Sequence, residues 1–530
     1  MNPSKNRPVS ENDRVTKATG VVGSATLLSR IFGFIRDVVI AGFFGAGLSS
    51  DAFFVAFRIP NLLRRLFAEG SLSVAFIPVF TEYLTHRGKE DAFEMARSAV
   101  RLLSVLLVAV AVTGIAFSPL IIRIIAPGFA DSPEKFTLTI FLTRVMFPYI
   151  FFIGMVALSM GILNVLGHFA APALAPVFLN ISIICSVFLI SPHMTDPVTG
   201  LAVGVVIGGV FQLALQVPFL IKKGFFFWQK AKIFHPGLKK IGRLMLPTIF
   251  GAAVYQINIL VGTLLASLLA QGSVSYLYYA DRLVQFPLGI FAIATATAVL
   301  PSLSRQATKK DLQAVRETFS YAMKLIFFIT IPSMVGLIVL REPIVALLFE
   351  RGAFDATTTH LTAYALLYYS IGLWAFSAVR IVVSTFYALQ DTRTPVITGA
   401  VSVCANIVLG IILMGPMGHG GLALSTSLAS MLNLGLLVWA LRAKLGALGL
   451  KSIAESACKT MICSGIMGTV VWAAALIIIP PEGGTLSGLF FGVLGSILIG
   501  LVLYGSFSVL FKSRELEKVM AIARIGTGRK

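Results

Sequence analysis

The strongest constraint on the fold of this sequence is a series of apolar stretches, each about as long as a membrane-spanning helix. A helix needs about 20 consecutive, mostly apolar residues to cross a bilayer. By that measure we predict fourteen spans, over residues 19–44, 51–80, 97–122, 136–162, 170–191, 199–221, 243–268, 274–303, 318–340, 358–388, 395–414, 420–441, 456–479 and 486–511. The first, second, fourth and tenth run long or contain internal Gly or Pro, such as Gly33, Pro60 and Pro148, so broken or tilted helices are expected there.

Composition supports the same class. Hydrophobic residues make up 57 % of the chain and charged residues 12 %, against about 45–50 % and 25 % in soluble domains. We therefore expect an all-α polytopic membrane protein with no separate soluble domain, and a first apolar stretch that is retained as a span. The four cysteines lie in apolar segments, so we expect packing roles rather than disulfides or a zinc site.

The distribution of basic residues predicts the orientation. With the N-terminus inside, the inner connections and the two termini hold 29 of the 43 lysines and arginines, while the outer connections hold only Arg123, Lys135, Arg341 and Arg351. This bias follows the positive-inside rule and places both termini in the cytoplasm. Most of the net charge of +20 is therefore a topology signal, and no nucleic-acid partner is expected.

The chain also repeats itself. "FFVAFRIP" (53–60) resembles "LYYADRLV" (277–284), with Arg58 over Arg282, and the segment from Gly200 resembles that from Gly421. Six spans per copy, an even number, give the copies the same orientation, as in a parallel repeat. We predict an N-terminal six-helix lobe over 1–221, a basic cytoplasmic linker over 222–242 and a second six-helix lobe over 243–445. Residues 446–530 then hold two extra helices and a basic tail.

Ten basic residues remain at membrane depth. They are Arg30, Arg36, Arg58, Arg64, Arg65, Arg101, Arg144, Arg282, Lys324 and Arg380. Arg101, Arg144, Lys324 and Arg380 are explained by snorkelling or local pairs. Arg30 and Arg64 lie near the middle of their predicted spans, where an arginine costs about 2.5–3.5 kcal/mol.

The acids near these arginines do not balance them. Glu69 follows Arg65 by four residues and can pair with it on a helix. Asp37 is predicted to lie on the same face as Arg30, and Asp51 at the outer mouth. Arg36, Arg58 and Arg64 then lack an evident counter-charge, while Asp281 is placed to reach Arg282 or the other repeat.

Surplus arginines in a water-filled cavity indicate an anionic ligand, and the planar guanidinium fork suits phosphate. The structural alternative is that they form ion pairs between helices. Signatures of catalysis are missing: the six histidines are scattered, and no G-x-S-x-G motif, P-loop or paired aspartates appear. We therefore expect a transporter, not an enzyme, without metal or cofactor.

Three motifs together resemble the MurJ (MviN) family of lipid II flippases. They are "SRIFGFIRD" (29–37), "SDAFFVAFRIPNLLRRLFAEG" (50–70) and "YYADRL" (278–283). The resemblance implies the fold of the multidrug/oligosaccharidyl-lipid/polysaccharide (MOP) exporter superfamily, with two six-helix lobes around a central cavity. It also implies two extra helices that form a groove for the lipid tail, and a location in the bacterial inner membrane.

The resemblance further implies alternating access that moves undecaprenyl-pyrophosphate-linked lipid II to the outer leaflet for cell-wall synthesis and cell shape. By motif position the cavity arginines fall on Arg30, Arg36, Arg64 and Arg282, with Asp51 and Glu69 at polar positions. Some relatives have an acid three residues after the YYADR arginine, where this chain has Gln285, so no role is assigned there.

Alternatives remain open. They are a flippase or exporter for another polyprenyl-linked saccharide, a multidrug exporter, a scaffold for cell-wall synthesis proteins and a polyprenyl-phosphate enzyme. A cation exporter would place acids in the cavity, and an enzyme would need a metal site or a nucleophile with a base. A scaffold leaves the mid-span arginines unexplained.

Overall fold

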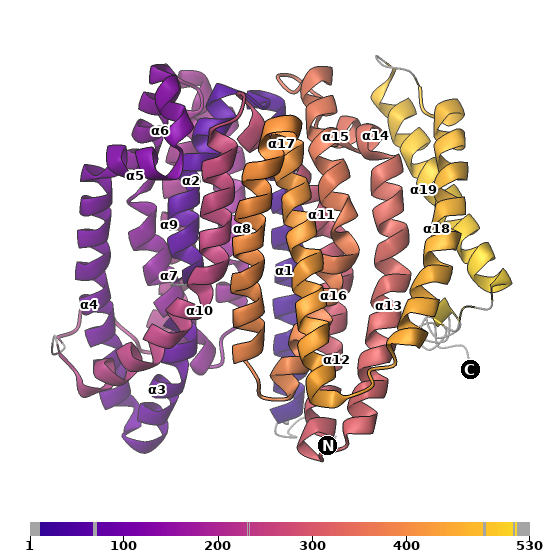
Figure 1. The fold of residues 1–530 in the computed structure, drawn as a ribbon. Coiled ribbons are helices and arrows are strands. Elements are labelled where there is room, and N and C mark those ends of the chain that lie inside the picture. Colours follow the sequence, from indigo (N-terminus) through magenta and orange to yellow (C-terminus); the bar gives the residue numbers. More distant parts are fainter. Residues whose placement is uncertain are drawn as a thin grey trace, which may run out of the picture. The chain divides into compact units, whose positions relative to one another are not determined.

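The computed structural model describes residues 11–66, 72–230, 232, 234–480, 484–511, 513, 515 and 516. Helices joined by short turns make up this part of the chain, and its only β-pairing is a single bridge between Arg351 and Phe354. The prediction of an all-α protein is therefore confirmed. Figure 1 shows the order of the helices.

In the first half of the chain, the described residues form α1 to α9 and the greater part of α10. Their bounds are α1 Glu11–Phe44, α2 Leu48–Leu66, α3 Leu72–His86, α4 Gly88–Ala116, α5 Ser118–Ile125, α6 Pro133–Met146, α7 Tyr149–Val165, α8 Ala170–Leu189, α9 Thr199–Lys222 and α10 Pro236–Ser267. The second half continues with α11 Ser273–Pro287, α12 Ile293–Thr308, α13 Leu312–Val339, α14 Arg341–Phe349, α15 Ala356–Ile371, α16 Leu373–Ala388, α17 Arg393–Leu445, α18 Leu450–Ile478 and α19 Leu486–Leu510.

Every predicted span overlaps a helix, but the helices do not all satisfy a strict criterion for crossing a membrane. Within the described residues, nine helical stretches are long and apolar enough, or ten if α15 and α16 form one bent span. The chain is thus a multi-pass membrane protein by length and composition. The number fourteen stays a prediction.

Breaks occur in three of the four spans where we expected them. The predicted span 51–80 is two helices, α2 and α3, and the span 136–162 breaks between α6 and α7 at Phe147 and Pro148. Helices α15 and α16 meet at Gly372 with a bend of 42°. By contrast, α1 continues unbroken through Gly33. An average of hydropathy over a long apolar stretch does not show where one helix ends and the next begins, because the residues on both sides of the break are apolar.

The order of helices recurs along the chain. The starts of α2, α4, α6 and α8 at residues 48, 88, 133 and 170 are followed by those of α11, α13, α15 and α17 at 273, 312, 356 and 393. Within the first copy α3 packs on α4 and α7, and within the second α12 packs on α13 and α16. The helices form two compact units, residues 1–264 and 265–530. The finer domain boundaries stay a prediction.

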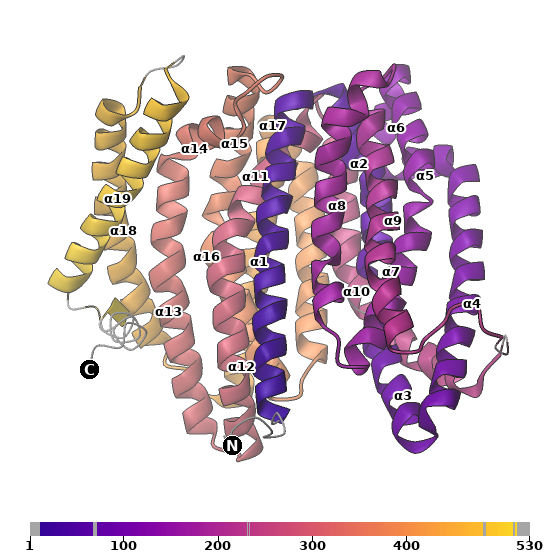
Figure 2. The same cartoon turned by 180° about the vertical axis from the view of Figure 1, so that it is seen from behind.

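Small residues bring helices close together in the first unit. Helix α8 packs against both α1 and α9, and Figure 2 shows α8 beside α1. A Cβ added to Gly200 or Gly204 of α9 would lie only 2.2 and 2.1 Å from the hydroxyls of Ser191 and Ser186. The glycine spacing therefore serves close helix packing, as small-xxx-small steps do in membranes.

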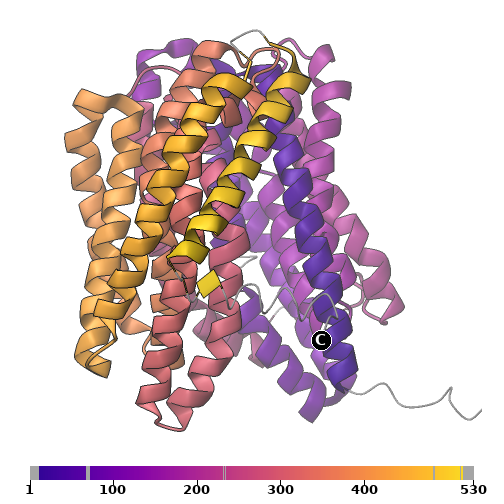
Figure 3. The same cartoon turned by 90° about the vertical axis from the view of Figure 1, so that its right-hand side faces the viewer.

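In the second unit, the two C-terminal helices pack on α13. A buried cluster joins them, formed by Phe328, Leu340, Cys463, Met467, Val471 and Tyr504, and the Tyr504 hydroxyl donates to the Phe328 carbonyl at 2.7 Å. Figure 3 shows α18 and α19 side by side as the orange-yellow and yellow helices. Cys463 thus has the predicted packing role, whereas Cys185, Cys404 and Cys458 are exposed.

Candidate functional site

Arg36 of α1 is held by a local network. Its Nε and Nη2 donate to Asp37 Oδ1 at 3.1 and 2.7 Å, and its Nη1 donates to Asn180 Oδ1 of α8 at 3.0 Å. Asn180 in turn donates to the Ser29 carbonyl at 3.1 Å. The Arg36 and Asp37 side chains are 12 % and 3 % exposed. This network fixes the guanidinium and ties α1 to α8.

Two sequence expectations are corrected here. Asp37 pairs with Arg36 rather than facing Arg30, and Arg36 does have a counter-charge. The expectation that Asp37 pairs with Arg30 rests on their spacing of seven residues, which puts both on one face of a helix. The long arginine side chain nevertheless reaches around the helix to its neighbour.

Arg30 has a different environment on the same helix. Its side chain is exposed and makes no hydrogen bond or ion pair with another described residue. A guanidinium keeps its charge and its five donors under all physiological conditions. Arg30 is therefore available to a ligand without first breaking a contact within the first unit.

Asp51 is half of a buried ion pair between α2 and α6. Lys135 Nζ lies 2.6 Å from Asp51 Oδ2, and the two side chains are 8 % and 1 % exposed. The same ammonium group lies 4.1 Å from the centre of the Phe129 ring. Sequence reasoning counted Lys135 among the outer connections. The signal for this pair in the sequence is the position of Asp51 near the start of an apolar stretch, because a buried aspartate requires a basic partner.

Two arginines of α2 lie at its C-terminal end. Arg64 and Arg65 occupy its last turn, and Arg64 Nε donates to Asn61 Oδ1 at 3.1 Å. Arg64 and Arg65 thus lie beside the break between α2 and α3 in the predicted span 51–80, and their depth in the membrane stays a prediction. Cations in a last turn are stabilised by the partial negative charge of the helix end. Glu69, the predicted partner of Arg65, lies outside the described residues.

Arg58 lies one turn before Asn61 and is half-buried, with its Nε enclosed.

Four basic residues were expected to make local pairs or to snorkel, and three of them do make local hydrogen bonds. Arg101 donates to the Gln229 carbonyl, Arg144 to Ser118 and Lys324 to Ser452.

Arg282 lies on α11 in the second unit. Its Nη2 donates to the Tyr278 hydroxyl at 3.0 Å, and the guanidinium carbon lies 4.7 Å from the centre of the Tyr278 ring. Asp281 accepts a hydrogen bond from Gln285, the residue to which we assigned no role from the sequence. This bond orients the Asp281 carboxylate. A π-helical turn at Leu288–Ala292 follows α11, and such turns are frequent at functional sites.

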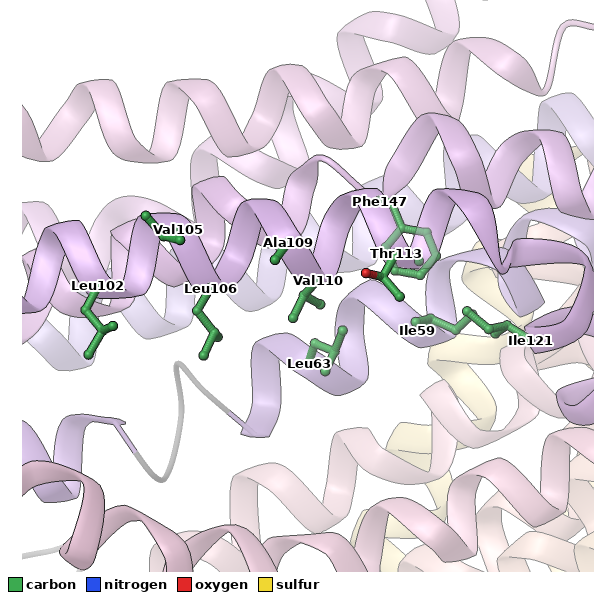
Figure 4. Close-up of a pocket in the computed structure, with 11 residues that line it drawn as sticks. Ile59, Leu63, Leu102, Val105, Leu106, Ala109, Val110, Thr113, Ile121 and Phe147 are labelled. Carbon is green, nitrogen blue, oxygen red and sulfur yellow. The ribbon is translucent and has the colours of Figure 1, made fainter.

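An apolar groove of about 580 Å³ lies on the first unit between α2 and α4. Figure 4 shows Ile59 and Leu63 of α2 facing Leu106 and Val110 of α4, with Phe147 at one end. Arg64 follows Leu63 directly, so the groove runs beside the arginine-bearing end of α2. An apolar chain can occupy such a groove without desolvating polar groups.

The described residues contain no group of three or more His, Cys, Asp or Glu that could hold a metal ion. Among the residues predicted to bind the ligand, the structure describes Arg36, Arg64 and Arg282 with local hydrogen bonds and Arg30 as exposed without one. This arrangement can bind an anion through charge-assisted hydrogen bonds.

Solved structures define the class of protein. An inward-facing MATE-family multidrug resistance transporter of the MOP superfamily matches with a TM-score of 0.67 and 19 % identity, covering 82 % of this chain and 99 % of that one. A structure described as lipid II flippase MurJ in an inward closed conformation matches with a TM-score of 0.78 and 31 % identity, over 92 % and 98 % of the two chains. The fold is that of the MOP superfamily of membrane transporters.

Sequence relatives narrow this class. The sequence model of the family described as "Lipid II flippase MurJ" matches residues 40–493. A probable lipid II flippase MurJ of Vibrio cholerae is 42 % identical, over 81 % of this chain and 83 % of its own. The lipid II flippase MurJ of Burkholderia cenocepacia is 37 % identical, over 80 % and 83 %. The chain belongs to the MurJ family.

Proposed function

We propose that this protein flips lipid II from the cytoplasmic to the outer leaflet of the bacterial inner membrane, with both termini in the cytoplasm. The observation that carries the proposal is the family match over residues 40–493, which includes the arginine-rich α2. The positive-inside distribution of basic residues supports the orientation. The test is to deplete the protein in growing cells and to measure whether lipid II accumulates in the inner leaflet.

Arg30, Arg36, Arg64 and Arg282 are proposed to bind the pyrophosphate of the head group. Arg30 is exposed, and Arg36 is oriented by Asp37 and Asn180. Guanidinium groups give phosphate two parallel hydrogen bonds as well as charge. The supporting polar residues have separate tasks: Asp37 orients Arg36, while Asp51 holds Lys135 and so ties α2 to α6.

The transport class predicts that no bond is made or broken. Purified protein given lipid II should return it chemically unchanged, with or without magnesium, because a flippase changes only the leaflet in which its substrate lies. Thin-layer chromatography and phosphate release measure this outcome. Release of phosphate or undecaprenol above that of protein-free vesicles would instead place the protein among polyprenyl-phosphate enzymes.

The path of the lipid tail is proposed to follow α18 and α19. The buried face of α19 carries small residues, Gly492, Ser496 and Gly500, whereas bulky apolar side chains such as Phe491 and Leu498 are 67 % and 52 % exposed. This surface suits an undecaprenyl chain, since each CH₂ moved into water costs about 0.8 kcal/mol. A second candidate is the apolar groove between α2 and α4.

A polar substitution on α19 tests this path. A Cβ at Gly495 meets nothing within 4 Å, whereas one at Gly468 would lie 2.5 Å from Val335 and disturb packing on α13. Gly495→Gln should therefore slow flipping of long-chain lipid II more than that of short-chain analogues in reconstituted vesicles. Equal loss for both chain lengths counts against the α19 path.

The matched variant in the other groove is Leu106→Gln. Leu106 lines the groove between α2 and α4 and is 45 % exposed. If Leu106→Gln rather than Gly495→Gln makes flipping depend on chain length, the tail runs along the first unit instead.

Flippases for other polyprenyl-linked saccharides carry substrates with the same pyrophosphate and tail. Only the sugar and the peptide of the head group distinguish those substrates from lipid II. Competition in the vesicle assay separates the two: excess lipid II should block transport of labelled lipid II, and a lipid-linked saccharide without the peptide should not. Equal competition by both would point to the broader substrate class.

A further inference from the structure

A pocket of about 560 Å³ with charged lining residues lies in the second unit, and none of the motif arginines lines it. It is enclosed by the first turns of α13, the start of α18 and the segment that follows α19. The residues that carry its chemistry are Arg316, Glu317, Lys324, Gly449 and Glu515. We refer to it as the α13–α18 pocket.

Hydrogen bonds hold the walls of this pocket together. Lys324 Nζ of α13 donates to Ser452 Oγ of α18 at 2.7 Å. Glu515 accepts from Ser456 of α18 at 2.9 Å and from Ser513 at 2.8 Å. Three separate segments are therefore held together around one space.

Glu515 is ionised in this setting. Burial raises the pKa of its carboxyl, but hydrogen bonds from Ser513 and Ser456 and the charge of Lys324 outweigh burial and hold the pKa below its ordinary value. Its two oxygens are each bonded to a hydroxyl, and its charge faces Lys324. Glu515 and Lys324 thus balance each other within the wall.

Arg316 lines the pocket and makes no hydrogen bond or ion pair with another residue that the structure describes. Its Nε is enclosed by protein, so only the outer nitrogens of the guanidinium can meet a ligand. A guanidinium keeps its charge and its donors, and phosphate matches its planar geometry. A phosphate group that enters the pocket can therefore bind Arg316 without first breaking a contact.

Glu317 adds a second charge of opposite sign. It is exposed next to Arg316 and accepts from Gln313 at 3.1 Å, which leaves its second oxygen for a ligand. The charged lining residues are two bases and two acids, so the pocket has no net formal charge. A ligand that carries both a phosphate and an ammonium group matches this lining better than a simple anion does.

The position of the pocket indicates where such a ligand comes from. Both α13 and α18 are apolar enough to cross a membrane, and the pocket lies at the ends where they start. On α18, exposed Ile462, Ile466 and Val470 follow at four-residue intervals and form one apolar stripe. Acyl chains can lie along this stripe while a head group enters the pocket.

We propose that the α13–α18 pocket binds the head group of phosphatidylethanolamine, with the phosphate on Arg316 and the ammonium on Glu317. The bound lipid bridges the second repeat and the two C-terminal helices. None of the proposed substrate arginines lines this pocket, and lipid binding to it can be tested without measuring transport.

Native mass spectrometry of the full-length, delipidated protein tests the proposal. Phosphatidylethanolamine, phosphatidylcholine and phosphatidylglycerol with identical acyl chains are titrated in parallel. Phosphatidylethanolamine should bind about tenfold more tightly than the other two, a difference of about 1.4 kcal/mol. Phosphatidylcholine has the same phosphate but no N–H donor, and phosphatidylglycerol has no ammonium. Equal or tighter binding of either lipid overturns the proposal.

Variants assign the contacts. Arg316→Gln should lower the affinity for phosphatidylethanolamine about tenfold, as loss of one charge-assisted hydrogen bond does. Glu317→Gln should abolish the preference over phosphatidylcholine. Arg305→Gln is the control, because Arg305 is exposed on α12, donates to Ser302 and lies outside the pocket.

Two results contradict the assignment directly. One is unchanged phosphatidylethanolamine binding in both Arg316→Gln and Glu317→Gln. The other is competition by glycerophosphoethanolamine, the head group without acyl chains, at the same concentration as the lipid. The second result would identify a soluble ligand rather than a membrane lipid. Because Glu317 is exposed, the Glu317→Gln variant is expected to fold. It therefore still tests the proposal if Arg316→Gln fails to fold.

Discussion

Arg30→Ala should abolish growth of cells that depend on this protein, while the amount of folded protein stays normal. Arg30 is exposed and has no partner among the described residues, so its removal leaves no broken contact behind. A lost charge-assisted hydrogen bond to pyrophosphate costs about 1.5–3 kcal/mol, or about 10- to 150-fold in affinity. Complementation of a depletion strain, with protein levels measured by immunoblot, provides the measurement.

The matched control is Arg380→Ala. Arg380 is also an exposed arginine within an apolar helix, α16, and we assign it no role in binding. Its variant should complement normally. Normal growth of Arg30→Ala cells would remove the main support for an anion site on α1.

The second large effect concerns stability. Asp51→Leu should destabilise the protein by about 3–5 kcal/mol, because it leaves the Lys135 ammonium buried without its counter-ion. Adding Lys135→Met should restore most of this loss, since a buried ion pair can often be replaced by apolar residues at little cost. Thermal unfolding of the purified protein in detergent measures both variants.

Glu82→Gln is the control for that series. Glu82 pairs with Lys240, but both side chains are about half exposed, and exposed ion pairs contribute about 0–1 kcal/mol. Its unfolding temperature should stay near that of the wild type. If Asp51→Leu unfolds at the same temperature as Glu82→Gln, the Asp51–Lys135 pair is not what ties α2 to α6.

The helical class and the internal repeat could be read from the sequence because both depend on patterns that extend over many residues. Apolar runs of span length leave few alternatives to helices in a membrane. The match of Arg58 with Arg282 predicted a recurring order of helices, and α2 and α11 do occupy equivalent places in that order. A break in the second span was expected, but the residues at which α2 ends and α3 begins could not be predicted from an apolar run.

Pairings of single side chains were harder to predict. Asp37 was assigned to Arg30 by helical spacing, yet the flexible guanidinium of Arg36 reaches it. The partners Lys135 and Asn180 come from helices distant in sequence, and their contacts depend on how α6 and α8 pack. Only tertiary packing sets those contacts, so a local spacing rule cannot find them.

The α13–α18 pocket illustrates the same limit. Lys324 was interpreted as a snorkelling residue, and its bond to Ser452 agrees with a local role. Its place in a pocket with Arg316 and Glu515 depends on the start of α18 and the segment after α19 both meeting the start of α13. Nothing in the spacing of these residues along the chain indicates that they share one site.

The central claim is that this protein carries lipid II across the membrane. Depletion of the protein in growing cells, followed by a leaflet-specific assay of the lipid II head group, tests this claim most directly. The account predicts that lipid II accumulates with its head group on the cytoplasmic side and that wild-type protein, but not Arg30→Ala, reverses the accumulation. Lipid II that continues to reach the outer leaflet at an undiminished rate after depletion would contradict the account.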